Sequence, residues 1–286
     1  MNWKPADYDL PDRDENQPCT ELPEPYKGDR FGYGAIIGDI VGSIYEFDNI
    51  KSKNFPFWSQ NAFFTDDTVM TIALYVSIVM YKKDSSRDFK KLLIYNMQKL
   101  GRKYPGCSYG AHFGAWLEAK DPKPYYSFGN GSAMRVSAAG FLADNMQEAI
   151  QYARESAEVT HNHPYGIAGA ESVAVGIYMA RDGRSKEQIR IELSKYWNLD
   201  FTLDEIRPDY EFDETCQGTV PQAIVAFLES KDFEDAIRNA ISIGGDSDTL
   251  AAITGSLAEA YYGIPLEMKK IALSYLDDYL KGLISI

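Results

Sequence analysis

Two short stretches, far apart in the sequence, place carboxylates and hydroxyls side by side directly before apolar segments. The first is FTDDT, which contains Thr65, Asp66, Asp67 and Thr68. The second is GGDSDT, which contains Asp246, Asp248 and Thr249. Clustered carboxylates and hydroxyls are the oxygen ligands that hard divalent cations prefer. A metal-assisted reaction is therefore the chemistry that these residues suggest.

A second interpretation of both stretches is helix capping. Threonine and aspartate side chains accept hydrogen bonds from the first N–H groups of a helix, and acidic groups favour its positive end. One cap needs one such residue, whereas each stretch has several, ahead of a helix that the sequence predicts to be buried. Buried carboxylates need a compensating cation, and no lysine or arginine lies near either stretch. Metal binding and double capping both stay open on the pattern alone.

The composition narrows the class of protein. The chain has 286 residues, is 45% apolar and 25% charged, and carries a net charge of −13, which argues against nucleic-acid binding. Its three cysteines, Cys19, Cys107 and Cys216, are widely spaced and indicate neither a disulfide framework nor a zinc site. No signal peptide and no apolar run long enough to cross a membrane is apparent. We expect a monomeric protein of the reducing cytoplasm.

The hydrophobic pattern is helical almost throughout. Residues 1–30 contain five prolines and little periodicity, which predicts an extended N-terminal arm, and residues 31–286 are predicted to form one all-α domain of roughly ten helices. In GYGAIIGDIVGSIYEF, three glycines and a glutamate recur every fourth residue and would form one ridge of a helix: Gly34, Gly38, Gly42 and Glu46. Because glycine disfavours helices, this ridge predicts close approach of another backbone.

Several helix ends are also readable. Asn145 and Asp232 are predicted N-caps, and Ser185 with Gln188 forms a predicted capping box. We expect Gly101 to close the helix that begins near residue 86, and the last long helices to run from Asp248 to Tyr262 and from Pro265 to near the C-terminus. Pro221 is expected at an early helical position.

The segment YYSFGNGSAMR is a glycine-rich turn that leads into a helix, which Ser132 is expected to cap. Such a turn presents backbone N–H groups at a helix N-terminus and can bind an anion, although most turns of this kind are structural. Two of the three histidines, His161 and His163, lie in VTHNHPYG. The other ligands of a zinc site are missing, and His163, which precedes a proline, is expected to have a role in the loop.

Five segments, in this order, resemble those of the ADP-ribosylglycohydrolase family: GAIIGDIVGSIYE, FTDDT, GNGSAMR, THNHP and GGDSDTLAAITGSLAEAYYG. The similarity covers residues 32 to about 265. It implies an orthogonal all-α multi-helix bundle that holds two Mg²⁺ or Mn²⁺ ions in a cleft. The metal ligands that it implies are Thr65, Asp66, Asp67, Asp246, Asp248 and Thr249. Glu46 matches the family's early glutamate and is expected to be a ligand, a gate or a proton-transfer group.

The resemblance also implies a site for ADP-ribose. Its diphosphate would lie at the glycine-rich loop, formed by Ser127, Phe128, Gly129, Asn130, Gly131 and Ser132. Phe128 would stack on adenine, His161 would hydrogen-bond the ribose side, and Tyr109 and Gly110 would line the cleft. Asp67 or Asp248 would act as the base in hydrolysis of the glycosidic bond, and Glu46 would assist departure of the leaving group.

Three functions remain open for such a protein. The favoured one is a hydrolase that removes ADP-ribose from a protein side chain, with arginine as the expected attachment residue. The others are a hydrolase of a small ADP-ribosyl compound or nucleotide, and a non-catalytic ADP-ribose-binding member of the family. The intact acidic residues weigh against the third function, because a degenerate relative would lose its ligands first.

Overall fold

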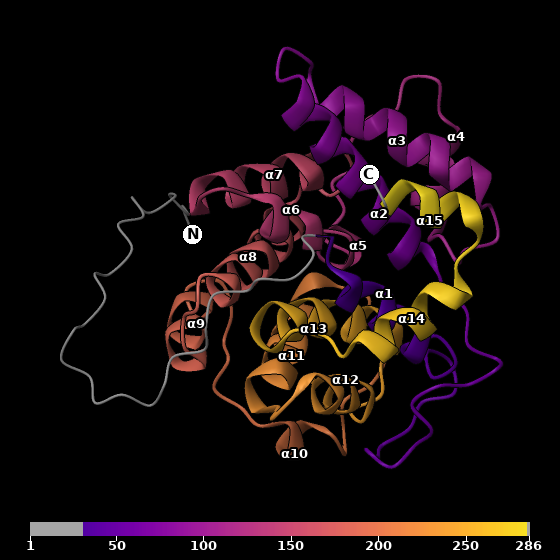
Figure 1. Cartoon of the computed structure of the whole chain (residues 1–286). Helices are drawn as coiled ribbons and strands as arrows, with labels where there is room; N and C mark the ends of the chain where they lie inside the picture. Colours follow the sequence, from indigo (N-terminus) through magenta and orange to yellow (C-terminus); the bar gives the residue numbers. More distant parts are fainter. Residues whose placement is uncertain (1–30, 285–286) are drawn as a thin grey trace.

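Apolar residues at helical spacing pack into a bundle in which long helices cross around a shared core (Figure 1). The structure, a computed structural model, describes residues 31–284. The helices are α1 (Tyr33–Gly42), α2 (Asp66–Lys83), α3 (Phe89–Lys103), α4 (Ala111–Glu118), α5 (Gly131–Met134), α6 (Ser137–Leu142), α7 (Met146–Glu158), α8 (Pro164–Arg181), α9 (Lys186–Leu193), α10 (Leu203–Ile206), α11 (Cys216–Glu229), α12 (Phe233–Ile241), α13 (Ser247–Tyr262), α14 (Leu266–Tyr275) and α15 (Asp278–Ile284).

The predicted all-α fold is confirmed. Within residues 31–284 no β-strand occurs, and extended pairing is limited to an isolated bridge between Gly129 and Thr215. The predicted extended arm, residues 1–30, lies outside the described residues, and the division of the chain into an arm and one domain stays a prediction. Among the same residues, no helix is both long enough and apolar enough to cross a membrane.

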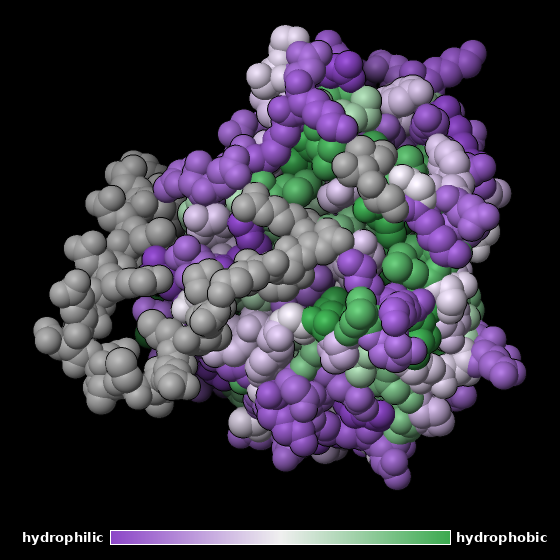
Figure 2. Space-filling view, viewed as in Figure 1, coloured by the Kyte–Doolittle hydropathy of each residue, from purple (hydrophilic) through white to green (hydrophobic). Residues whose placement is uncertain are grey.

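Helices α1 and α13 form the centre of the bundle. All ten residues of α1 are buried, and α13 is buried from Ser247 to Ala260. A helix that is surrounded by protein can be apolar on every side, which explains why these segments lack the polar face of a surface helix. On the face shown in Figure 2, hydrophilic residues dominate the upper and lower margins and hydrophobic residues gather between them.

The predicted glycine ridge is the place where α1 and α13 touch. A methyl group built at Gly38 would lie 2.0 Å from the carbonyl oxygen of Ala251, and one at Gly42 would lie 2.5 Å from the Cα atom of Asp248. Gly34 meets the α13 backbone in the same way. The two backbones are therefore in direct contact, and this contact places the C-terminal end of α1 beside the acidic N-terminus of α13.

The ridge ends earlier than its four-residue spacing predicts. Helix α1 stops at Gly42, so Glu46 lies in the turn after the helix and not on the ridge. Ser43 caps this end through its backbone N–H, which donates to the carbonyl oxygen of Asp39 at 2.8 Å. The turn carries Glu46 away from the helix axis and towards the start of α13.

Local capping predictions hold well. Asn145 accepts a hydrogen bond from the backbone of Glu148, Asp232 caps α12, and Ser185 and Gln188 form the reciprocal capping box. Gly263, with φ 75°, ends α13. These signals are reliable because cap and partner lie within three or four residues of each other.

Three predicted helix boundaries are wrong. Helix α3 continues past Gly101 to Lys103, since this glycine makes room for the Leu117 side chain and does not turn the chain. Helix α11 begins at Cys216, where Thr215 supplies the cap, so that Pro221 lies inside it. The C-terminal segment breaks after Tyr275 into α14 and α15.

The helix contact predicts a steep response to one added methyl group. We expect Gly38→Ala to lower the free energy of unfolding by about 3 kcal/mol or more, because the methyl group overlaps a backbone that cannot move aside. The matched control is Gly282→Ala in α15, where nothing lies within 4 Å and where alanine should stabilise the helix by up to about 1 kcal/mol. Urea unfolding measures both; a Gly38→Ala protein as stable as wild type would contradict the contact.

Candidate active site and metal centre

Both acidic stretches and the glycine-rich loop line one cavity of about 620 Å³. Its lining residues are Glu46, Asp66, Asp67, Ser108, Gly110, Ala111, His112, Phe113, Tyr125, Tyr126, Ser127, Phe128, Gly129, Asn130, Gly131, Met134, Arg135, His161, Phe212, Glu214, Thr215, Asp246, Asp248 and Thr249. Cavities of this size hold small molecules and cofactors.

The two acidic stretches meet directly, although 182 positions separate the residues that touch. The hydroxyl of Thr249, in the first turn of α13, donates a hydrogen bond of 3.2 Å to Oδ2 of Asp67, in the first turn of α2. The glycine-rich loop joins them, since the side-chain amide of Asn130 donates to Oδ2 of Asp246 at 2.7 Å. Three parts of the chain thus form a single polar site.

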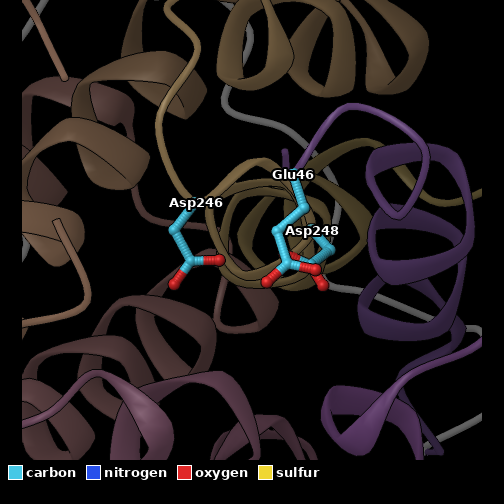
Figure 3. Close-up of side chains that lie close together, drawn as sticks. All are labelled: Glu46, Asp246 and Asp248. Atoms are coloured by element: carbon cyan, nitrogen blue, oxygen red, sulfur yellow. The ribbon is translucent and has the colours of Figure 1, made fainter. Parts of the chain in front are cut away.

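Glu46, Asp246 and Asp248 form the centre of this site. Each offers a carboxylate oxygen, and these oxygens lie within 4.8 Å of one another. Figure 3 shows the three carboxylates pointing to the same side at the N-terminal end of α13, with Glu46 arriving from the turn after α1. Oxygen atoms at this separation can contact one divalent ion together.

The carboxyl groups of the site are buried, and their pKa values are raised. Burial raises the pKa of Asp66, Asp67 and Asp248 well above the ordinary value, and neighbouring acidic groups raise it further. Burial, with Asp246 and Asp39 nearby, raises the pKa of Glu46 to about 7. The pKa of Asp246 is raised by burial as well, although hydrogen bonds oppose the shift. The metal-free site therefore favours protons or cations.

The first turn of α2 is capped from a different helix. Asp39, fully buried in α1, accepts from the backbone N–H of Thr65 at 2.9 Å and of Thr68 at 3.1 Å, and both threonine hydroxyls also donate to it. Burial, opposed by these hydrogen bonds, raises the pKa of Asp39 to about 6. Asp39 thus shares the capping of α2 with Thr65, whose hydroxyl accepts from the backbone N–H of Asp67.

Capping therefore does not account for the acidic stretches. Thr65 is the N-cap of α2 and accepts from the Asp67 backbone, whereas Asp246, the N-cap of α13, makes no side-chain capping bond. Oδ1 of Asp67 is buried without a hydrogen-bond partner. An orphaned carboxylate oxygen beside three converging carboxylates fits a hard cation bound through oxygen ligands.

The glycine-rich loop is fixed by the segment that leads into α11. The backbone N–H of Asn130 donates to the Glu214 carbonyl at 2.7 Å, and that of Cys216 donates to the Phe128 carbonyl at 2.9 Å. The N–H of Gly129 donates to the Ser127 hydroxyl at 3.1 Å. Two backbone N–H groups of this loop are therefore used within the protein, and the loop is held rigidly against the cavity.

Not every predicted site residue faces the cavity. Thr65, Tyr109 and Ser132 are absent from its lining. Ser132 does not cap α5, which has no side-chain cap; its hydroxyl donates to the Gly166 carbonyl at 2.7 Å. The Tyr109 hydroxyl is buried without a partner. His163 caps α8 by accepting from the Tyr165 backbone at 3.1 Å, in agreement with its predicted role in the loop.

Hydrogen bonds favour one tautomer of His161. Buried Arg135 donates to the hydroxyl oxygen of Thr160 at 2.9 Å, and this hydroxyl lies 2.7 Å from Nδ1 of His161. Because the arginine can only donate, the hydroxyl hydrogen is free to point to Nδ1, an arrangement that favours the ring proton on Nε2. Burial and the charge of Arg135 lower the pKa of His161 well below its ordinary value. A neutral ring thus offers an Nε2–H donor beside Gly129 and Gly131.

Eleven of the lining residues, among them the four named next, and one supporting residue were not predicted as site residues from the sequence. His112, Arg135, Phe212 and Glu214 line the cavity, and Asp39 caps α2 below it. Asp39 had a readable signal, since an aspartate inside the apolar run GAIIGDIVG must be buried and needs partners. Phe212 and Glu214 had none, because their segment reads as an ordinary acidic loop.

Comparison with known proteins agrees with the site. A family model described as ADP-ribosylglycohydrolase matches residues 32–281, and the chain belongs to this family. The chain is similar to ADP-ribosylhydrolase ARH3 of Xenopus tropicalis, with 26% identity over 85% of this chain and 90% of the relative. It is also similar to ADP-ribosylarginine hydrolase Tri1 of Serratia proteamaculans (strain 568), with 25% identity over 92% of this chain and 82% of the relative.

A solved structure shares the fold. The structure titled ADP-ribosylglycohydrolase-related protein complex superposes with a TM-score of 0.62 and 25% identity, covering 86% of this chain and 96% of that chain. The protein is therefore an ADP-ribosyl hydrolase of the ADP-ribosylglycohydrolase family, with an acidic cluster that can bind metal.

The histidine arrangement predicts a selective effect at Thr160. We expect Thr160→Val to remove the preference of His161 for the Nε2–H tautomer, because Nδ1 loses its hydroxyl donor. The same change should lower the free energy of unfolding by about 1–3 kcal/mol, because Arg135 loses an acceptor. Thr160→Ser keeps the hydroxyl and should keep the tautomer. Multiple-bond ¹H–¹⁵N spectra at pH 7 report the tautomer directly; a wild-type ring protonated on Nδ1 would contradict the arrangement.

The carboxyl cluster predicts an unusual pH dependence in chelator-treated protein. A carboxyl whose folded pKa is raised binds more protons in the folded state, so its contribution to stability falls as pH rises above the unfolded pKa of about 4 and through the raised folded pKa. We expect Asp248→Asn to remove part of this loss and to raise the melting temperature of the metal-free protein at pH 8. Asp121→Asn, at an exposed aspartate outside the cavity, is the control. A lower melting temperature for Asp248→Asn at pH 8 would show that the carboxylate is stabilising without metal.

Proposed function

We propose that the protein cleaves the glycosidic bond that joins ADP-ribose to a protein side chain, with arginine as the attachment residue. The observation that carries this proposal is the meeting of Asp67 with Thr249, which brings two acidic stretches and the glycine-rich loop into one cavity. Family membership supplies the reaction class, and the structure supplies a place where a ligand and acidic groups can meet.

The proposed cofactor is a pair of Mg²⁺ or Mn²⁺ ions. Their ligands would be Thr65, Asp66, Asp67, Asp246, Asp248 and Thr249, all of which offer oxygen atoms. The hydroxyl of Thr65 donates to Asp39 and accepts from Asp67, which leaves one lone pair for an ion. When bound, such ions supply Lewis acidity and compensate the charge of the carboxylates.

Two kinds of residue would serve the reaction in the proposed mechanism. Asp67 or Asp248 accepts the proton of the attacking water, and Glu46 donates a proton to the leaving group. Glu46 suits the second task because it is half-buried, lines the cavity, and has a pKa raised to about 7, near the operating range of a general acid. The glycine-rich loop, with Phe128 and the Nε2–H donor of His161, would position the ADP-ribose unit.

The choice of arginine rests on charge. Glu46 and Glu214 line the cavity, and Asp48 and Glu211 are exposed near them in the sequence, so the acidic surroundings suit a cationic leaving group. The relative named ADP-ribosylarginine hydrolase Tri1 agrees with this choice. The second candidate is hydrolysis of a small ADP-ribosyl compound, which the volume of the cavity also allows. A location in the cytoplasm is consistent with the free thiols of Cys107 and Cys216.

The test is hydrolysis of a panel of ADP-ribose linked to arginine, to serine and to small molecules, with Mg²⁺, with Mn²⁺ and with excess chelator. We expect release of ADP-ribose from the arginine-linked substrate with metal and none with chelator. Asp66→Ala/Asp67→Ala should lower the rate by about a thousandfold and leave the helical circular dichroism unchanged, because these side chains bind and do not cap. Asp121→Ala is the matched control.

Full activity of the double variant, or of the wild type in chelator, would refute a metal-dependent role for the acidic stretches. Release from small compounds alone would select the second candidate. Tight ADP-ribose binding without turnover of any substrate in the panel would identify a binding protein.

A further inference from the structure

The side chains of two phenylalanines are exposed to solvent at the edge of the cavity. Phe47 is 83% exposed and Phe212 is 46% exposed, yet their rings lie nearly parallel, with centroids 6.1 Å apart and 23° between planes. Phe212 lines the cavity, and Phe47 directly follows Glu46, which also lines it. Single exposed apolar side chains are common, but an exposed pair at the mouth of a site marks a surface for binding.

The segments that carry the two rings are firmly held. The side-chain amide of Asn49 donates to the Gly245 carbonyl at 2.9 Å and accepts from the Gly245 backbone N–H at 2.7 Å. The ammonium group of Lys51 donates to the carbonyls of Tyr210 and Ile243. These bonds join the segment after α1 to the segment before α11 and to the start of α13, so the spacing of the rings is set by the fold.

The surroundings of the rings are acidic. Residues 46–49 and 209–214 contain acidic side chains and no basic ones: Glu46, Asp48, Asp209, Glu211, Asp213 and Glu214. Lys51 lies between the segments, where backbone carbonyls bind its ammonium group. A ligand that combines positive charge with a flat apolar face complements this mouth, whereas an anion does not.

We propose that Phe47 and Phe212 form the leaving-group subsite, which binds the planar guanidinium of an ADP-ribosylated arginine. The inference rests on the proposed function and names the residues that select its substrate. A guanidinium is weakly hydrated and stacks on aromatic faces, while nearby carboxylates attract its charge. The hydroxyl leaving group of serine is neutral and gains from neither feature.

The stacked pair is separate from the aromatic residues around His163. Tyr126 and Phe128 surround His163, with ring centroids 4.7 and 5.2 Å from it, next to the glycine-rich loop. The ADP-ribose unit is expected next to this loop. Phe47 directly follows Glu46 of the acidic cluster, where the bond to be cleaved and the departing side chain would lie. Phe212 stacks on Phe47 from a segment that also holds the glycine-rich loop, since the Glu214 carbonyl accepts from the backbone N–H of Asn130.

The experiment replaces both rings by an apolar side chain that cannot stack. We expect Phe47→Leu/Phe212→Leu to raise KM for an arginine-ADP-ribosylated peptide about five- to twentyfold, the sum of two exposed cation–π contacts. The Kd for free ADP-ribose and the rate with serine-linked substrate should stay within twofold of wild type. Tyr95→Leu, at a 58% exposed ring of α3 outside the cavity, is the matched control. Melting temperatures verify that every variant is folded.

An unchanged KM for the arginine-linked peptide would overturn the subsite. An equal loss of affinity for ADP-ribose would overturn it too, because the rings would then serve the common part of the substrate. If the wild-type protein hydrolyses neither linkage, the proposed function is refuted. Equilibrium binding of the two peptides then tests whether the rings form the proposed subsite. Arginine-linked peptide must bind more tightly than serine-linked peptide, and the double leucine variant must lose that difference.

Discussion

The main physical constraint on this structure is that several carboxyl groups lie close together in one buried cavity. Glu46, Asp66, Asp67, Asp246 and Asp248 all line the same cavity, and burial together with mutual repulsion raises the pKa of each. Such groups push one another apart and towards water. They stay in place only because their backbones are held independently, and their charge invites the cation that would compensate it.

The scaffold meets this requirement with two devices that do not use the acidic side chains themselves. Backbone contact along the Gly38 ridge of α1 places Asp248 of α13 at a fixed distance from the end of α1. Asp39, on the same helix, anchors Thr65 and Thr68 at the start of α2. One buried helix therefore positions both acidic helix starts, and a carboxylate oxygen such as Oδ1 of Asp67 keeps no partner in the protein and is available to a ligand.

The lining of the cavity carries charges of both signs. Arg135 is the one lysine or arginine in its lining among residues 31–284, and through Thr160 it directs an Nε2–H donor of His161 to the glycine-rich loop. The other charged residues of the lining are acidic. A ligand that carries both an anionic and a cationic group would meet opposite charges in this lining, and such a match of charge favours one orientation over the reverse.

The sequence by itself determined what depends on near neighbours along the chain. Helical periodicity, caps such as Asn145 and Ser185, and the adjacency of Asp66 and Asp67 all involve residues within a few positions, whose geometry a helix fixes. The recurrence of glycine every four residues even predicted the backbone contact of α1. Motif resemblance, in turn, indicated which segments share a cavity.

Only the tertiary structure decided which groups face one another. Thr249 meets Asp67 across 182 positions, and Asp39 of α1 takes part in capping α2. Glu46 lies beyond the end of α1, and Ser132 donates to the Gly166 carbonyl instead of capping a helix. The tertiary structure also stacked Phe47 on Phe212 from two loops that read as ordinary surface. The physical reason is that these distances follow from the crossing angles of all the helices packed between the segments, and no local pattern contains them.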